Sequence, residues 1–191
     1  MIDDSREKLI NMIMFFLKNT KRCGKTKLFK LLNFADFLHF KQTGKSISGL
    51  EYYAWDRGPV PVSLFEEFKH PPKDLLDCFV IPTDEELEKD TENDYKFFAL
   101  KGRKKFDNKY FSDRELEIIK QIAYIYKEVN AKDIVEASHL KNRPWHKTYH
   151  KKGRLEKIDY FLALDDEKDS LPEEIIRDRT EEINEMKKIF G

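Results

Sequence analysis

The chain has 191 residues, and its 36 lysines and arginines balance 36 aspartates and glutamates, so the formal net charge is zero. That balance argues against a module that binds nucleic acid through an overall basic excess. Fifteen phenylalanines, eight tyrosines and two tryptophans supply the core of one compact domain, while seven glycines and seven prolines argue against a loop-rich or disordered chain.

Two helices are predicted at the N-terminus. The first runs from Ser5, a good N-cap, to about residue 18, and the turn at Cys23-Gly24 ends it. The second runs from Thr26 to about residue 41, with Gly44 as its stop. Because leucine and phenylalanine occupy nearly every face of the second helix, it is expected to lie at the centre of the domain.

Residues 48–55, SGLEYYAW, form an aromatic run that is typical of a short strand or an extended arm. The Gly-Pro-Val-Pro of residues 58–61 is expected to leave any strand ladder, because proline has no N–H to donate. We predict a turn there, feeding a short helix over residues 62–68 that ends at His70-Pro71-Pro72.

The second half of the chain alternates between loops and helices. Residues 84–94 are acidic and predict a mobile surface loop, and residues 95–100 predict a weak strand. Ser112 and Glu115 form a capping box for a helix that is expected to reach about residue 129, with Leu116, Ile119, Ile122, Ala123 and Tyr126 facing inward. Shorter helices are predicted over residues 132–138 and from Pro144, which precedes Trp145. A last helix is predicted over residues 172–190. The fold class is therefore mainly α: a compact helical domain with a small β element and a C-terminal helix.

Cysteine content and the N-terminus bear on the compartment. Cys23 and Cys78 do not make a disulfide framework, which favours a reducing environment. The N-terminal residues MIDDSREK place acids where a signal peptide has basic residues, and the apolar run from Leu9 to Leu17 is too short to span a bilayer. We therefore expect a cytoplasmic protein with no membrane partner.

Motifs for catalysis, cofactors and metals are weak. Neither GxxxxGK[ST] nor GxGxxG occurs, and Gly24-Lys25-Thr26 lacks the upstream glycine and the preceding strand of a phosphate loop. His139, His146 and His150 have a spacing of seven and four, without the glutamate of a metalloprotease helix or a nearby cysteine. No local motif supports a cysteine–histidine–aspartate triad. We expect no catalytic residue, no cofactor and no metal site, and hence no enzyme.

Two basic stretches leave a second function open. Residues 18–30 and 141–154 each carry six lysines or arginines and no acid. Such patches steer an acidic partner or contact nucleic acid, although a solvated charged face is an equally good interpretation. A nucleic-acid-binding regulator that uses residues 18–30 and 141–154 is therefore the alternative function.

A family resemblance rests on two blocks of sequence. The first comprises Lys27, Leu28, Leu31, Leu32, Ala35 and Asp36, followed by Gly49, Tyr52, Ala54, Gly58, Pro59 and Val60. The second is a looser block with His139 and, shortly after it, Trp145. Over roughly residues 5–165 the chain resembles the Panacea domain, the family of SocA-like antitoxins. The resemblance implies a mainly helical antitoxin that neutralises a cognate protein toxin by direct binding, with no catalytic residues.

The residues themselves suggest where a partner would bind. Tryptophan, tyrosine and arginine are enriched among interface hot spots, and they gather beside a proline-fixed turn at Tyr52, Trp55, Arg57, Gly58 and Pro59. These five are the predicted partner-binding residues. Lys27, Asp36, Gly49, His139 and Trp145 carry the family motif in a structural or binding role. Residues 1–168 are expected to form the Panacea-like domain and residues 169–191 a C-terminal helical extension.

Overall fold

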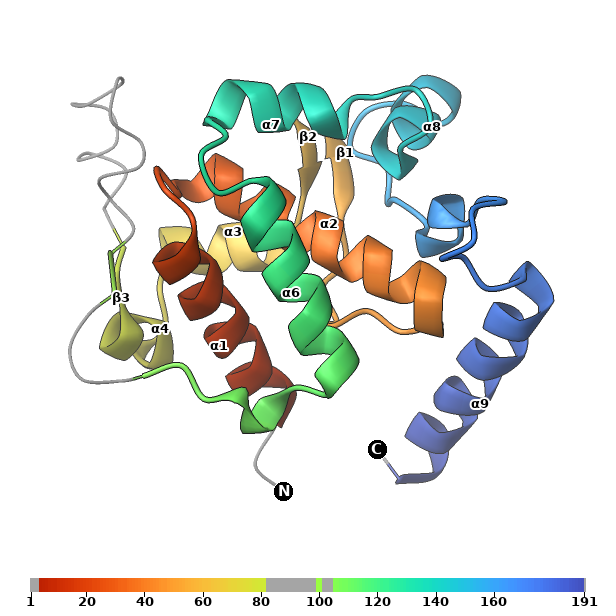
Figure 1. Ribbon diagram of the computed structural model, residues 1–191, viewed down its shortest axis with the longest axis horizontal. Coiled ribbons are helices and arrows are strands. Elements are labelled where there is room, and N and C mark those ends of the chain that lie inside the picture. The colour runs from red at the N-terminus through yellow and green to blue at the C-terminus, as the bar shows by residue number, and fades with distance from the viewer. Residues whose placement is uncertain (1–3, 82–98, 101–104, 191) are drawn as a thin grey trace.

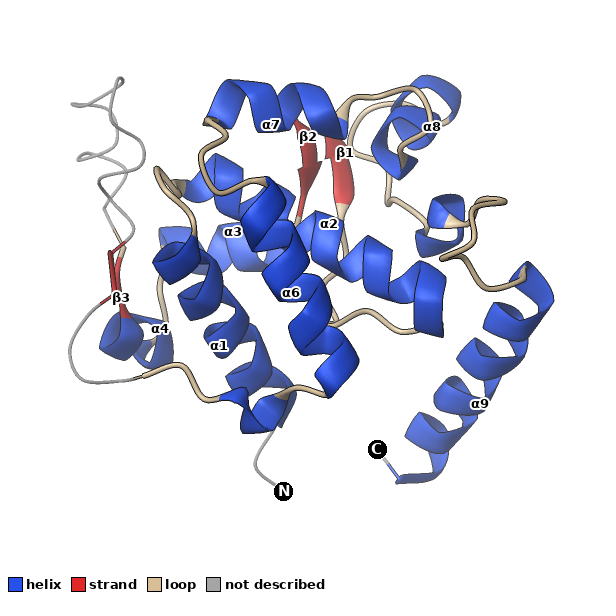
Figure 2. Ribbon diagram, viewed as in Figure 1, coloured by secondary structure: helices blue, strands red, loops and turns tan. Residues whose placement is uncertain are grey.

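The computed structural model of the chain describes residues 4–81, 99–100 and 105–190, and helices predominate there (Figures 1 and 2). The helices are α1 (Asp4–Asn19), α2 (Lys25–Thr43), α3 (Val62–Lys69), α4 (Lys73–Cys78), α6 (Asp113–Ile125), α7 (Ala131–Ser138), α8 (Pro144–Lys151) and α9 (Glu173–Phe190). Two 3₁₀ turns, η2 (Asn108–Tyr110) and η3 (Tyr160–Ala163), and two two-stranded sheets are also present among these residues. The predicted fold class is confirmed.

Helix α2 lies at the centre, as its apolar faces predict. It contacts α1, α6, α7, η3 and β2, and side chains on every face of it are buried. Gly44 ends it in the left-handed region at φ 82°, where glycine is favoured, and donates its N–H to the Phe40 carbonyl. The burial includes three charged groups, Lys27, Lys30 and Asp36, each no more than 1% exposed. Their contacts determine how the rest of the chain is arranged around α2.

The aromatic run forms a hairpin, and the turn expected at Gly58-Pro59 is a strand instead. Strand β1 (Tyr53–Trp55) pairs antiparallel with β2 (Gly58–Val60), which places Pro59 opposite Ala54. The backbone polar groups of Ala54 point away from β2, toward residues 155 and 156. Its N–H donates to the Glu156 carbonyl (2.9 Å), and its carbonyl accepts from the Leu155 N–H (2.8 Å). Proline is tolerated because the ladder requires no N–H at that position.

Helix α6 begins at the predicted capping box, in which the Ser112 hydroxyl and the Glu115 carboxylate each bind the other's backbone N–H. The helix ends at Ile125, earlier than expected, because the backbone beyond it turns so that the carbonyls of Lys127 and Val129 reach Lys27. Ile118 joins its buried face, whereas Leu116 and Tyr126 lie at the edge of the core.

Elements between residues 70 and 105 were only partly foreseen. Helix α4 is stabilised by the buried Leu75 and Cys78 and follows the proline pair without an amphipathic repeat long enough to recognise. Strand β3 (Phe79–Val80) pairs antiparallel with β4 (Ala99–Leu100), which is the end of the strand expected over residues 95–100. The loop predicted over residues 84–94 lies outside the described residues.

Helix α9 stands at one side of the molecule and slants down and inward from its beginning to its C-terminal end (Figure 1). Ile176 is fully buried, whereas Met186 and Ile189 are 54% and 71% exposed. The helix is fastened near its beginning, where the Leu171 N–H donates to the Lys41 carbonyl (2.9 Å). No helix of the described residues is both long enough and apolar enough to cross a membrane.

Candidate partner-binding surface

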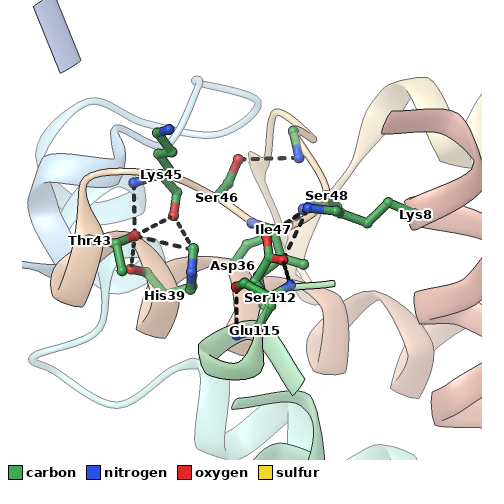
Figure 3. A network of polar contacts seen from close by, with 11 residues as sticks. Lys8, Asp36, His39, Thr43, Lys45, Ser46, Ile47, Ser48, Ser112 and Glu115 are labelled. Atoms are coloured by element: carbon green, nitrogen blue, oxygen red, sulfur yellow. Dashed lines mark hydrogen bonds and ion pairs between the residues drawn. The ribbon is translucent and has the colours of Figure 1, made fainter. Parts of the chain in front are cut away.

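Asp36 fixes the start of the aromatic arm to the central helix (Figure 3). Its Oδ1 accepts the N–H groups of Ile47 (2.9 Å) and Ser48 (2.8 Å), and its Oδ2 accepts the Tyr52 hydroxyl (2.7 Å) and the Ser48 hydroxyl. Burial raises the pKa of Asp36 to about 6, against the opposing effect of these donors. Gly49 completes the turn with φ 73°. Asp36, Gly49 and Tyr52 therefore have structural roles here.

Lys27 joins three distant pieces of backbone. Its Nζ donates to the carbonyls of Lys21 (2.7 Å), Lys127 (3.2 Å) and Val129 (2.6 Å), which follow the ends of α1 and α6. Three carbonyl acceptors satisfy the three donors of an ammonium group. Burial lowers the pKa of Lys27. This motif residue is thus buried, and it holds three backbone segments together by hydrogen bonds.

Lys30, on α2, holds the β1–β2 hairpin by a hydrogen bond. Its Nζ donates to the Pro59 carbonyl (2.9 Å), and burial lowers its pKa to about 7. Gly58 lies directly above it with φ 95°; a Cβ at this position would come within 2.6 Å of the Ser138 hydroxyl and 2.7 Å of Lys30 Cε. Gly58 is required here both for its backbone conformation and for the close approach of α7.

His139 and Trp145, the second motif block, support the same hairpin from the other side. The His139 ring stacks on Trp145 with centroids 3.8 Å apart, and the Trp145 Nε1–H donates to the Trp55 carbonyl (2.9 Å). Burial, and then the charge of Lys30, lower the pKa of His139. Both motif blocks therefore converge on the β1–β2 hairpin, which they fix in place.

The hairpin presents an open pocket of about 360 Å³, which we name the arm pocket. Two aromatic rings form its walls: Trp55 and Phe65 meet edge to face with centroids 5.0 Å apart. Its cations are Lys25, whose Nζ lies 5.1 Å from the Phe65 ring centre, together with Arg57 and Arg154. It is a basic, aromatic-walled site on a rigid support.

The five predicted partner-binding residues divide into two groups. Trp55 is half-buried and Arg57 exposed, and both line the arm pocket. Tyr52, Gly58 and Pro59 are buried, so they position the surface from beneath it. Sequence reasoning missed Lys25, Phe65 and Arg154 as members of the site, because they come from α2, α3 and the segment after α8.

Some of the basic side chains in residues 18–30 and 141–154 are buried or already paired, so fewer are available to bind an acidic partner than the composition suggests. Lys27 and Lys30 are buried, Lys21 pairs with Glu128 (3.0 Å), and Arg154 pairs with Asp56 (2.5 Å). Three residues of the two stretches line the arm pocket: Lys25 and Lys30 from the first, and Arg154 from the second. Other basic residues of the two stretches are exposed and lie outside that pocket, namely Lys18, Arg22, Lys141, Arg143, Lys151 and Lys152.

Groups considered for metal or nucleophilic chemistry do not assemble into such a site. The rings of His146 and His150 lie 4.2 Å apart, while His139 faces Trp145. Within the part of the chain that the structure describes, the one three-ligand cluster is Asp165, Glu167 and Asp169, and Lys41 Nζ pairs with all three (3.2, 3.5 and 2.7 Å). Cys23 is buried, which raises its pKa to about 11 and disfavours the reactive thiolate.

Comparison with known protein families matches residues 28–146 to the family described as antitoxin SocA-like, Panacea domain. The matched span includes Lys30, Asp36, the whole β1–β2 hairpin and the histidine–tryptophan stack. Helix α9 lies outside it. No curated protein and no solved structure gives a significant match to the chain.

Proposed function

The chain belongs to the SocA-like antitoxin, Panacea-domain family, and from this we propose that it is the antitoxin of a toxin–antitoxin pair. In this proposal it neutralises a cognate protein toxin by direct binding, without turnover. The toxin is held at the arm pocket, the surface formed by Lys25, Trp55, Arg57, Phe65 and Arg154.

The observation that carries the proposal is the set of contacts that hold the backbone of the hairpin on which Trp55 and Arg57 lie. Lys30 holds Pro59, Trp145 holds the Trp55 carbonyl, and Gly58 packs against Ser138. A contact surface that is already ordered loses little conformational entropy when a partner arrives. Tryptophan and arginine side chains in such a setting are the usual source of interface binding energy.

The pocket also indicates what the toxin presents. Among the described residues, Lys25 and Arg57 form no salt bridge, whereas Asp56 already accepts Arg154 and the Tyr149 hydroxyl. The pocket therefore has cationic groups available and aromatic walls. It suits an aspartate or glutamate side chain that is flanked by an apolar one, because a carboxylate pairs with guanidinium and ammonium groups while the neighbour covers Trp55 and Phe65.

The experiment is co-expression with the product of the adjacent gene, scored for growth, followed by a binding measurement with the purified pair. The substitution Arg57→Glu should weaken binding by about 1–3 kcal/mol, in the range of ordinary hot-spot losses. Lys120→Glu, an exposed charge reversal on α6, is the matched control and should have no effect. If the neighbouring product is harmless, or if a folded Arg57→Glu protein binds it as before, the proposal or its placement fails.

A further inference from the structure

Helix α9 carries apolar side chains that its own molecule does not cover. Its first turn is anchored, because Ile176 is fully buried beside Gly44 and Arg179 donates to the Thr43 carbonyl (3.4 Å). Toward the end of the helix Ile183 is half-buried, and Met186 and Ile189 are 54% and 71% exposed. An amphipathic helix whose apolar residues face water is typical of an interaction site.

The same molecule has an unfilled groove of about 680 Å³ between α2, α6 and the α7–α8 connection, which we name the α2–α6 groove. Its floor is aromatic: Phe34 stacks on Tyr126 with ring centroids 5.0 Å apart. Two large apolar side chains stand exposed at its rim, Ile125 at 51% and Leu140 at 57%. Lys141 and Arg143 also line the groove, and the Arg143 guanidinium lies 5.5 Å from the Phe34 ring centre, so the groove suits a helix with both apolar and charged faces.

We propose that a second copy of this chain fills the α2–α6 groove with the C-terminal half of its α9, so that the protein forms a two-fold symmetric dimer. The groove ends at Asp165, Glu167 and Asp169, immediately before α9 begins. Helix α9 has 18 residues and is about 27 Å long at about 1.5 Å per residue. When two α9 helices pair antiparallel, the end of each lies beside the beginning of the other, and therefore beside the partner's groove.

Charge complementarity supports a second copy as the occupant. Among the residues that the structure describes, Lys41 alone pairs with the three carboxylates of Asp165, Glu167 and Asp169, which leaves a surplus of negative charge at that end of the groove. The last turn of α9 brings Lys188, and the sequence has a further lysine beside it. The antiparallel arrangement therefore places lysine opposite carboxylate twice, once in each half of the dimer.

The helix cannot serve its own groove while its first turn stays in place. Ile176 and Arg179 fix the beginning of α9 against the end of α2, and the rest of the helix slants down and inward, standing apart from the ribbons of α2 and α6 (Figure 1). A two-fold dimer covers the exposed apolar face of α9 and the α2–α6 groove in both copies. The contacts of Ile176 and Arg179 at the beginning of each α9 stay in place. The arrangement is isologous, so it closes on itself and does not propagate into a fibre.

The test is the molar mass of the full-length chain by light scattering and sedimentation, with no toxin present, so its result is independent of the proposed function. We expect twice the 22.9 kDa of one chain. Leu140→Glu and Ile189→Glu, each made at an exposed position, should shift the protein to monomer while its circular dichroism spectrum stays that of the folded wild-type protein. Val80→Glu, at an exposed apolar residue of β3, is the control and should remain dimeric.

A charge exchange gives a second, independent criterion. Lys188→Glu alone and Glu167→Lys alone should each weaken the dimer at low salt by about five-fold or more, and the two together should restore it. A chain that stays monomeric at the highest concentration reached without aggregation overturns the proposal. So does a dimer that survives both Leu140→Glu and Ile189→Glu, since another surface would then hold it together.

Discussion

The Nζ of Lys30, buried in the central helix, donates its hydrogen bond to the carbonyl of Pro59 across 2.9 Å. The β1–β2 hairpin thus packs on an amine from a lysine that is only 1% exposed. Burial of the charged form is costly, and it lowers the pKa of Lys30 to about 7. The stability of the hairpin and its pH dependence are therefore linked through a single side chain.

The free energy of unfolding should rise with pH above neutrality. Between pH 7 and about 10.4 the unfolded chain holds a proton at Lys30 that the folded chain has released, and stability increases wherever the unfolded state binds more protons. The gain from pH 7 to pH 9 should be about 2–3 kcal/mol, at roughly 1.4 kcal/mol per pH unit. Denaturant unfolding at the two pH values measures it.

The comparison protein for that experiment is Lys30→Met, which keeps the length of the side chain without its charge. Other groups titrate in the same range in both proteins, so the difference between them isolates Lys30. The substituted protein should lack most of the gain. An equal slope in both proteins would mean that Lys30 titrates normally in the folded state.

Gly58 and Gly49 form a matched pair for measuring the tightness of the hairpin. Both have positive φ, 95° and 73°, so alanine costs about 1 kcal/mol of backbone strain at either position. A Cβ at Gly49 meets no atom within 4 Å, whereas one at Gly58 overlaps Ser138 and Lys30. Gly58→Ala should therefore destabilise the protein by about 2–4 kcal/mol and Gly49→Ala by about 1 kcal/mol in thermal or denaturant unfolding. Equal losses would contradict the close packing of the hairpin on α7.

Tyr52→Phe tests whether Tyr52, one of the predicted partner-binding residues, stabilises the fold or contacts the toxin directly. The Tyr52 hydroxyl donates to Asp36 (2.7 Å) in a fully buried setting, so its removal should cost about 1–3 kcal/mol of folding free energy. Toxin affinity of the folded protein should stay the same, in contrast to Arg57→Glu. A loss of affinity without a loss of stability would show that Tyr52 meets the partner directly.

Truncation after Asp169 should leave a cooperatively folded protein. It removes α9 but keeps Asp169, which pairs with Lys41 (2.7 Å). The principal loss is the burial of Ile176, about 2–3 kcal/mol. Circular dichroism melting and proton NMR dispersion are the measurements. A chain that no longer folds would place α9 inside the domain and move the boundary expected at residue 168.

Local rules predicted the helices well and the charged interior poorly. Gly44, the Ser112–Glu115 box and Pro144 act within a few residues of themselves, so the sequence displays them directly. Lys27 and Lys30 are counted in a basic stretch because lysine is normally exposed. Their burial depends on the Lys127, Val129 and Pro59 carbonyls, which come from elsewhere in the chain.

The candidate surface was half predictable for the same reason. Residue type singled out Trp55 and Arg57, which line the arm pocket. Residue type also singled out Tyr52, whose hydroxyl instead satisfies a buried carboxylate that lies 16 positions earlier. Phe65 and Arg154 complete the pocket by coming from α3 and the segment after α8. The sequence did not predict strand β2, because proline is normally excluded from a ladder. At Pro59 the ladder needs no N–H, since the opposite residue, Ala54, makes its hydrogen bonds with Leu155 and Glu156.

The three carbonyls that accept hydrogen bonds from Lys27 also bear on when the fold can be completed during synthesis. Two of them belong to Lys127 and Val129, and the first lies 100 positions after Lys27. At roughly 5–20 residues per second, a ribosome takes about 5–20 s to make that interval. Throughout it, the emerging chain carries a helix that is apolar on nearly every face and a lysine without its acceptors. Until α6 and the loop after it have left the ribosome, the nascent protein therefore exposes an apolar helix, the kind of surface that makes partly folded chains prone to aggregation.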